Sequence, residues 1–381
     1  MARVRATHIL PLLLLPALCG CGADAPAAPP PLTPAALEVV VEKPGIAREK
    51  LARAVDALFS GANDDGDMGE TRAVIVMRNG RTIAERYGPG YHQNTRFISW
   101  SMAKTVTATM IGMLVADGRI RLGESAPVPA WQRPGDPRGE ITLKQLLQMR
   151  SGLRHTEAGD PIYASDEVQM LFREGRNDMA AWAEAQPLEA EPGAEWEYSS
   201  NTTVILADIA ARALTGDEGQ DGRDPETRRK AVSEYLRNRL WEPLGMRSML
   251  PEFDANGTLI GGSLMHATAR DWAKFGELLR NGGSVGGVQL VPRAWIDFMT
   301  TPNPRNKFYG AQTWLNCGEG ADKQYPGALP SVFSMNGHLG QYVVVSPRQG
   351  LTVVRLGNTR QDRLDAVQAR IADILKLFPA R

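Results

Sequence analysis

Hydrophobic residues recur with two different periods along this chain of 381 residues. Residues 46–60 carry apolar side chains at spacings of three and four, which predicts an amphipathic helix. Residues 73–78 and 81–86 are strand-like instead, and the Asn79-Gly80 pair between them is typical of a tight hairpin turn. The first part of the fold is therefore expected to be a helix followed by a β-hairpin.

The C-terminal part has the same elements in the reverse order. Residues 341–346 and 351–356 are rich in valine and are separated by the turn sequence Pro-Arg-Gln-Gly at 347–350. A helix is predicted over residues 362–377, where the apolar side chains share one side. The two ends can join in one antiparallel sheet covered by terminal helices, with the middle of the chain as a mostly helical lobe. The pattern thus predicts an α+β fold.

A third apolar pattern, from Met102 to Asp117, predicts a core helix that stops at Gly118. Ser101 precedes this helix and Lys104 lies in its first turn, so their side chains share a face within hydrogen-bonding reach. A serine hydroxyl needs a proton acceptor to become a nucleophile, and a lysine that burial keeps neutral can accept that proton. The pair is therefore a candidate for nucleophilic catalysis. A helix-capping serine followed by a solvent-facing lysine is the alternative.

Two polar patches further along the chain accompany this pair. The first is Tyr-Ser-Ser-Asn at residues 198–201, just before a helical pattern, and the second is Asn-Gly-His-Leu-Gly-Gln at residues 336–341, just before the valine-rich strand. With the Ser-x-x-Lys pair, these patches resemble the three motifs of the penicillin-recognising serine hydrolases. That superfamily includes class C β-lactamases, D-Ala-D-Ala carboxypeptidases, and several esterases and amidases. The resemblance covers residues 45–380 and implies a β-lactamase/transpeptidase-like fold with the three motifs around one cleft.

Within that superfamily the chain most resembles the 6-aminohexanoate-dimer hydrolase group. The similar segments are Ser-Trp-Ser-Met-Ala-Lys at 99–104, Gly-Gly-Ser at 261–263 and His-Leu-Gly-Gln-Tyr at 338–342. That group cleaves the amide bonds of short linear oligomers, and its members often hydrolyse small esters. The resemblance implies that Ser101 is the nucleophile, that Lys104 is its base, and that Tyr198 returns a proton to the leaving group.

The remaining expected site residues hold the oxyanion or the substrate. The backbone N–H of Gln341 is expected in the oxyanion hole, because Gly340 lets the strand backbone approach the substrate. Ser200 and His338 are expected to contact the substrate, and both depart from β-lactamase patterns. Ser200 stands where those enzymes have an asparagine, with Asn201 one place late, and His338 replaces a lysine that would bind a carboxylate. Both differences weaken the prediction of β-lactam hydrolysis.

Composition excludes several other functions. The 43 basic residues balance the 43 acidic ones, which argues against a nucleic-acid partner. The sequence has no HExxH motif, no paired CxxC and no phosphate-binding loop, so no metal or nucleotide cofactor is predicted. It also has no Gly-x-Ser-x-Gly motif, which argues against the α/β-hydrolase fold.

The N-terminus resembles a bacterial lipoprotein signal. Arg3 and Arg5 precede an apolar run at residues 9–18, and Leu-Cys-Gly-Cys at 18–21 resembles a lipobox that would lead to lipidation of Cys21. Anchoring in the bacterial cell envelope is predicted, on the periplasmic side of the outer membrane. The alternative is an ordinary cleaved signal and a soluble periplasmic protein.

Three segments follow from these observations. Residues 1–20 are predicted to be the signal peptide, residues 21–44 a lipidated cysteine with a flexible tether, and residues 45–381 the hydrolase domain. The predicted function is cleavage of amide or ester bonds of small molecules through an acyl-enzyme. A β-lactamase or D-Ala-D-Ala carboxypeptidase is one alternative, and a catalytically silent binding protein of the cell envelope is another.

Overall fold

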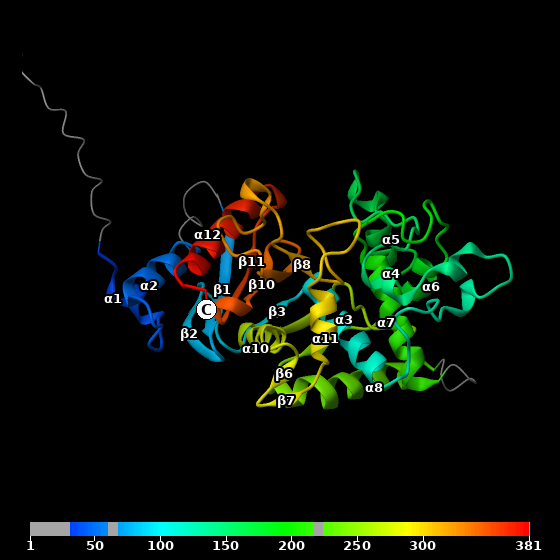
Figure 1. The fold of residues 1–381 in the computed structure, drawn as a ribbon, viewed down its shortest axis with the longest axis horizontal. Helices are drawn as coiled ribbons and strands as arrows, with labels where there is room; N and C mark the ends of the chain where they lie inside the picture. The colour runs from blue at the N-terminus through cyan, green and yellow to red at the C-terminus, as the bar shows by residue number, and fades with distance from the viewer. Residues whose placement is uncertain (1–30, 60–67, 217–223, 381) are drawn as a thin grey trace, which may run out of the picture.

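The two ends of the chain meet in one six-stranded antiparallel sheet (Figure 1). The computed structural model describes residues 31–59, 68–216 and 224–380. The strand order in this sheet is β2 (Arg81–Tyr87), β1 (Glu70–Arg78), β11 (Leu351–Asn358), β10 (Gln341–Ser346), β9 (Phe333–Gly337) and β8 (Trp314–Leu315). The N-terminal hairpin thus pairs with the C-terminal hairpin through β1 and β11. This arrangement confirms the predicted α+β fold.

Alternation along β1 divides the hydrophobic interior into two layers. Val74 and Val76 belong to the layer beneath helices α2 (Arg48–Asp56) and α12 (Leu364–Lys376). The intervening residue Ile75 points into the opposite layer, because successive strand side chains face opposite sides of a sheet. Both terminal helices therefore cover one face of the sheet, and the second face is free to pack on the rest of the molecule.

The second face carries helix α10 (Ala269–Arg280) and connects to a helical lobe, which lies at the opposite end of the molecule from α2 and α12 (Figure 1). The helices of this part are α4 (Leu143–Leu147), α5 (Asp166–Phe172), α6 (Met179–Glu184), α7 (Ser200–Thr215), α8 (Pro225–Leu236), α9 (Glu242–Leu244) and α11 (Arg293–Met299). Two small sheets consist of β3 (Arg96–Ile98), β5 (Met265–Thr268) and β4 (Leu250–Pro251), and of β6 (Ser284–Val285) with β7 (Val288–Gln289).

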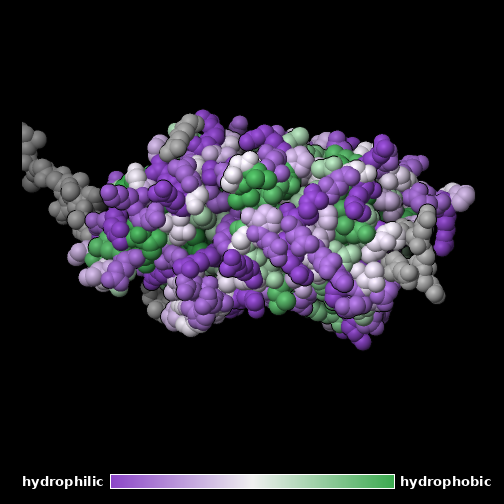
Figure 2. All heavy atoms as spheres, turned by 90° about the horizontal axis from the view of Figure 1, so that it is seen from below, coloured by the Kyte–Doolittle hydropathy of each residue, from purple (hydrophilic) through white to green (hydrophobic). Residues whose placement is uncertain are grey.

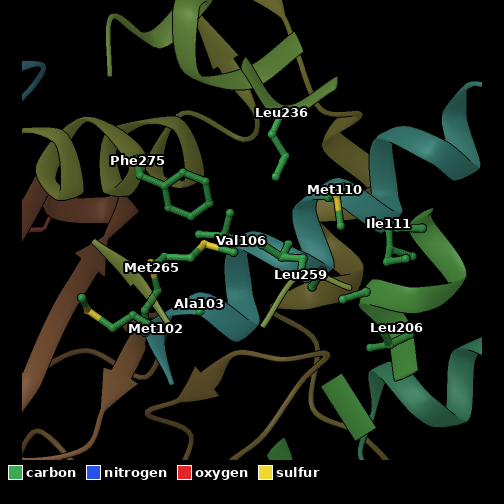
Figure 3. Packing of buried hydrophobic residues seen from close by; sticks show 14 of the residues in the cluster. Met102, Ala103, Val106, Met110, Ile111, Leu206, Leu236, Leu259, Met265 and Phe275 are labelled. Atoms are coloured by element: carbon green, nitrogen blue, oxygen red, sulfur yellow. The ribbon is translucent and has the colours of Figure 1, made fainter. Parts of the chain in front are cut away.

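Helix α3 (Met102–Ala116) runs between the sheet and the helical lobe. All of its residues from Met102 to Leu114 are buried, because apolar or small side chains occupy every side of it. Figure 3 shows its side chains in one hydrophobic cluster with Leu206 of α7, Leu236 of α8 and Phe275 of α10. The helix that carries the predicted Ser-x-x-Lys pair is therefore the central element of the core.

The folded body begins earlier than the predicted boundary at residue 45. Helix α1 (Pro34–Glu38) is followed by Val40, which is fully buried. The amide of Val41 donates to the carbonyl of Ile83 at 3.1 Å, and the amide of Glu85 donates to the carbonyl of Val39 at 2.9 Å. These hydrogen bonds pair backbone groups on the outer edge of β2, so part of the predicted tether is packed on the sheet. The predicted signal peptide and Cys21 lie outside the described residues.

The surface is mixed in polarity. The face drawn in Figure 2 is mostly hydrophilic, and its hydrophobic patches are separate from one another. Across residues 31–59, 68–216 and 224–380, none of the helices combines the length and the hydrophobicity that crossing a bilayer requires.

Gly112 lets α3 pack directly against α11. A Cβ atom at this position would lie 2.2 Å from Nε1 of Trp295, whose indole is buried and donates a hydrogen bond to the carbonyl of Ala108 at 3.0 Å. Because this ring cannot move without losing that bond, we expect Gly112→Ala to lower the free energy of unfolding by about 1–3 kcal/mol. Urea denaturation would measure the change. The control is Gly123→Ala, where a Cβ atom meets nothing within 4 Å. Equal stability of both variants and the parent would contradict this packing.

Candidate active site

Ser101 and Lys104 are in direct contact at the start of α3. The Lys104 amine lies 2.9 Å from Oγ of Ser101, and the lysine side chain is only 2% exposed. The same amine lies 2.7 Å from Oγ of Ser200 and 3.0 Å from the carbonyl oxygen of Gly262. The alternative of a solvent-facing lysine is therefore wrong, and the amine is enclosed by three oxygen atoms.

Burial and nearby carboxylates act on this amine in opposite directions. Burial lowers the pKa of Lys104 below its ordinary value, because the ammonium form loses its hydration. The negative charges of Glu157 and Glu167 partly oppose that shift. The carboxylate Oε1 of Glu157 is 3.8 Å from the amine. The net direction favours the neutral amine, which is the form that can accept a proton from Ser101.

The backbone before Ser101 is held in an unusual conformation. Trp100 has a φ of 44°, in the left-handed region that non-glycine residues seldom adopt. Ser99 fixes the preceding position, because its amide donates to the carbonyl of Met265 at 2.7 Å and its hydroxyl donates to the carbonyl of Ser263 at 3.1 Å. A strand, a constrained residue and a helix thus set the place of the Ser101 hydroxyl.

Tyr198 lies beside the Ser-Lys pair, just before α7. The amine of Lys104 is 4.8 Å from the centre of its ring, and the ring packs against Trp196, Tyr309 and Trp314. Burial raises the pKa of Tyr198 well above its ordinary value, the charge of Glu157 adds to the shift, and a hydrogen bond with Ser101 opposes it. Tyr198 is therefore a phenol at neutral pH, and it can pass a proton but cannot act as a resting phenolate.

The second motif places Ser200, and not Asn201, against the lysine. The contact with Lys104 comes from Oγ of Ser200. Asn201 is buried, and neither its side-chain oxygen nor its side-chain nitrogen has a hydrogen-bond partner within the part of the chain that the structure describes. At the second motif the lysine amine thus meets a hydroxyl oxygen.

The third motif approaches the nucleophile through Gly337. A Cβ atom on Gly337 would lie 2.2 Å from the carbonyl oxygen of Ser99, so only glycine fits between β9 and the segment that precedes Ser101. This close approach is between two backbone segments, and the predicted approach of Gly340 to a substrate stays a prediction. Gly340 has a φ of 81° after Leu339 at 61°, and these two residues form the left-handed turn that leads into β10.

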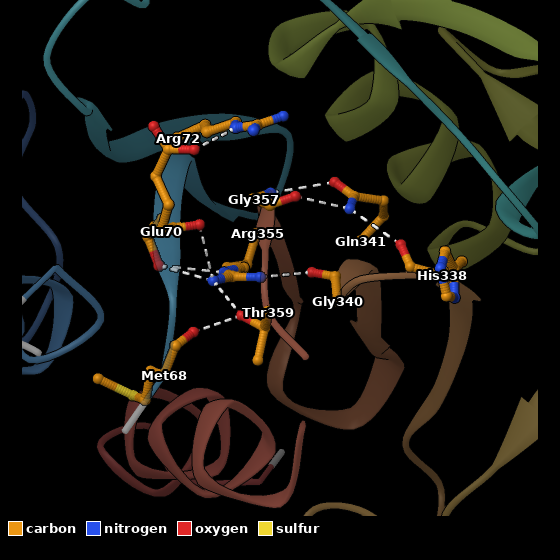
Figure 4. A network of polar contacts seen from close by, with 10 residues as sticks. Met68, Glu70, Arg72, His338, Gly340, Gln341, Arg355, Gly357 and Thr359 are labelled. Carbon is orange, nitrogen blue, oxygen red and sulfur yellow. Dashed lines mark hydrogen bonds and ion pairs between the residues drawn. The ribbon is translucent and has the colours of Figure 1, made fainter. Parts of the chain in front are cut away.

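Side chains of β10 and β11 hold this turn by hydrogen bonds (Figure 4). The side-chain amide of Gln341 donates to the carbonyls of Gly357 at 2.8 Å and His338 at 3.0 Å, and its oxygen accepts from the Gly357 amide at 3.0 Å. Arg355 is buried and donates to the carbonyl of Gly340 at 2.8 Å. Burial lowers the pKa of Arg355 to about 10. The side chain of Gln341 thus stabilises the turn, and its backbone N–H is the group that can face the site.

His338 lies on the site side of the turn. Its ring meets Trp100 edge to face, with ring centres 5.3 Å apart. Burial lowers the pKa of His338 below its ordinary value, so the imidazole is mainly neutral at pH 7. The residue is therefore a polar contact for a substrate and supplies little positive charge.

Two carboxylates that the sequence did not reveal complete the surroundings of Ser200. Glu157 comes from the loop that precedes α5, and Glu167 lies in the first turn of α5. Oε1 of Glu157 accepts from the Ser200 hydroxyl at 2.7 Å, and Oε2 accepts from the Ser200 amide at 2.6 Å. Oε1 of Glu167 lies 3.0 Å from the same hydroxyl oxygen. Burial and the charge of Glu157 raise the pKa of Glu167 to about 7.

This geometry can be compared with known proteins. A family model described as Beta-lactamase matches residues 55–376. The chain belongs to the Beta-lactamase family. The 6-aminohexanoate-dimer hydrolase of Paenarthrobacter ureafaciens is 26% identical over 236 residues, which are 60% of this chain and 56% of that protein, so the chain spans little more than half of this relative.

Solved structures show the same fold. A Bacillus anthracis protein described as a candidate 6-aminohexanoate-dimer hydrolase has a TM-score of 0.65 and 23% identity, and the match covers 81% of each chain. A family VIII carboxylesterase has a TM-score of 0.59 and 17% identity, and the match covers 84% of this chain and 97% of that one. The Beta-lactamase family is a family of hydrolases, and this chain has its antiparallel sheet and helices.

In this member of the Beta-lactamase family, a cavity of about 690 Å³ adjoins the aromatic cluster around Tyr198. Trp196 and Trp314 belong both to that cluster and to the cavity wall, and Phe308 adds a third aromatic side chain. Asp365 and Gln368 lie on another part of the wall. The cavity has room for a small organic group with an apolar body.

Proposed function

We propose that this chain is a serine hydrolase that cleaves amide or ester bonds of small molecules through an acyl-enzyme on Ser101. One observation carries the proposal. A buried lysine amine with a lowered pKa lies 2.9 Å from a serine hydroxyl at the start of a helix. The helix start offers the positive end of the helix dipole, which favours negative charge on an attacked carbonyl oxygen.

In the proposed reaction, Oγ of Ser101 bonds to the substrate carbonyl carbon while its proton passes to the amine of Lys104. The tetrahedral intermediate collapses and the bond to the leaving group breaks. The leaving group takes a proton from the Tyr198 hydroxyl, and Tyr198 regains a proton from the Lys104 ammonium group. Water then attacks the acyl ester and releases the acid. The backbone N–H groups of Ser101 and Gln341 would stabilise the oxyanion, since the turn before β10 is held against the segment before Ser101.

The surroundings of the site disfavour a carboxylate close to the cleaved bond. His338 is mainly neutral, and Glu157 adds negative charge beside the lysine, so such a carboxylate would be held weakly. The similarity to a 6-aminohexanoate-dimer hydrolase and the shared fold of a carboxylesterase support linear amides and small esters as substrates. A β-lactamase, a D-Ala-D-Ala carboxypeptidase and a catalytically silent binding protein are the rival functions.

We also propose that the mature protein is a lipoprotein of the bacterial cell envelope. The support is the Leu-Cys-Gly-Cys sequence at 18–21, which follows an apolar run. Lipid on Cys21 would hold the protein at the membrane, and its other partner would be the small-molecule substrate. A soluble periplasmic enzyme is the alternative.

Ser101→Ala is expected to abolish covalent labelling by a fluorophosphonate and to lower ester hydrolysis by about 10⁴-fold or more, because the nucleophile is lost. Intact-protein mass spectrometry would detect the adduct, and peptide mapping would locate it.

Labelled penicillin serves as a second probe. Labelling by the fluorophosphonate alone supports an esterase or amidase, labelling by both supports a penicillin-recognising enzyme, and labelling by neither supports a silent fold. Activity of the variant within tenfold of the parent would exclude Ser101 as the nucleophile.

A p-nitrophenyl ester and a linear 6-aminohexanoate dimer are expected to be better substrates than a cephalosporin. The cephalosporin carboxylate is fixed close to the reacting amide, whereas the carboxylate of the dimer lies at the far end of a flexible methylene chain. The loss of a fixed positive charge should therefore cost the cephalosporin about 1–3 kcal/mol, which is roughly tenfold to a hundredfold in relative rate. The measurement is kcat/KM for the three compounds on one preparation. A higher kcat/KM for the cephalosporin would place the chain functionally with the β-lactamases.

Cys21→Ser is expected to release the protein from the membrane fraction of a bacterial host, because the acyl chains on Cys21 would be lost. Fractionation and the intact mass of the mature protein are the measurements. Cys19→Ser is the matched control, since Cys19 falls within the segment that would be removed. A mature chain without lipid that begins after residue 21 would refute the anchor.

A further inference from the structure

Ser200 connects the carboxylate of Glu157 to the amine of Lys104. Its hydroxyl has one hydrogen and two lone pairs. Three groups surround its oxygen, namely Oε1 of Glu157 at 2.7 Å, Oε1 of Glu167 at 3.0 Å and the Lys104 amine at 2.7 Å. The direction of the single hydroxyl hydrogen therefore decides what the lysine meets.

Glu157 is the nearer of the two carboxylates that can accept that hydrogen, at 2.7 Å against 3.0 Å for Glu167. One of the Glu157 carboxylate oxygens accepts from the Ser200 amide and the other accepts from the Ser200 hydroxyl. Because the amide holds the first oxygen, the carboxylate cannot rotate away from the hydroxyl. With the hydrogen directed to Glu157, the oxygen of Ser200 can only accept from Lys104. The carbonyl of Gly262 can also only accept.

These two acceptors use both hydrogens of a neutral lysine amine. Its remaining position is the lone pair, and the one remaining neighbour among the three oxygens is Oγ of Ser101 at 2.9 Å. The lone pair is thereby directed at the hydroxyl that must lose its proton. We infer that Glu157 is a positioning residue that acts through Ser200 to aim the lone pair of Lys104 at Ser101. This inference rests on the proposed function, because it assigns the group that orients the proposed base.

Glu157→Gln should reverse the orientation. If the amide oxygen of the glutamine accepts from the Ser200 amide, its NH₂ group must donate to the Ser200 hydroxyl. The hydroxyl hydrogen then has two remaining acceptors, Oε1 of Glu167 at 3.0 Å and the Lys104 amine at 2.7 Å, and when it points at the amine it competes for the lone pair. We expect the rate of fluorophosphonate labelling and kcat for the ester to fall about tenfold to a hundredfold, with KM changed less than about threefold. Glu174→Gln, an exposed glutamate beyond the end of α5, is the matched control.

A double-mutant cycle with Ser200→Ala separates this role from a purely structural one. The serine variant alone should lose a similar factor, and the double variant should be within about threefold of it, because the path from Glu157 to Lys104 is already broken. Multiplicative losses in the cycle would overturn the inference. If Glu157→Gln does not fold, Ser200→Ala still decides, since a parent-like labelling rate in that variant would also overturn it.

The pH profile gives a second readout. Glu157, Glu167 and Tyr198 are the titratable groups around the Lys104 amine. Removing the charge of Glu157 lowers the pKa of Lys104, so the acid limb of the profile should move to lower pH in Glu157→Gln even as the maximal rate falls. An acid limb that stays in place or moves to higher pH would contradict the inference. A parent protein that no fluorophosphonate labels would instead refute the proposed function.

Discussion

The burial of the Lys104 amine is the constraint on which the rest of the site depends. An ammonium group enclosed in protein loses its hydration, and its neutral form is favoured unless nearby charges compensate. Here the amine has three oxygen neighbours, while Glu157 and Glu167 act against the neutral form from slightly further away. The site therefore holds a base whose pKa is lowered, together with carboxylates that fix its surroundings. A fully apolar pocket would also neutralise the lysine, but it would leave the direction of its lone pair undefined.

The scaffold is built to keep this amine in place. Helix α3 carries both Ser101 and Lys104 through the centre of the core, so neither residue can move without disturbing the packing seen in Figure 3. The turn between β9 and β10 is held from the opposite side by Gln341 and the buried Arg355. The strain at Trp100 lies where these two parts meet. Rigid helix, braced turn and constrained backbone together give the site a fixed geometry before any substrate binds.

Local sequence patterns predict much of the fold and the contact between Ser101 and Lys104. The hairpin at Asn79-Gly80 and the helix α12 follow from turn chemistry and from a period of 3.6, and the Ser101–Lys104 contact spans only one helical turn. The sequence does not reveal Glu157, because its partner Ser200 is 43 residues away and no motif or period links them. Arg355 lies in a valine-rich strand, and the pattern does not show that its side chain donates to the Gly340 carbonyl. The predicted boundary at residue 45 falls after Val39 and Val41, because no motif or period marks their pairing with β2.

Direct titration of the Lys104 amine tests the account most closely. Protein labelled with ¹³C and ¹⁵N in lysine gives side-chain resonances that report protonation, and Lys104→Ala assigns the signal. We expect this amine to titrate below the ordinary lysine value of about 10.4. A short lysine-containing peptide measured under the same conditions provides the reference. An amine that titrates at or above 10.4 would show that the carboxylates outweigh burial, and Lys104 could then not be the resting base.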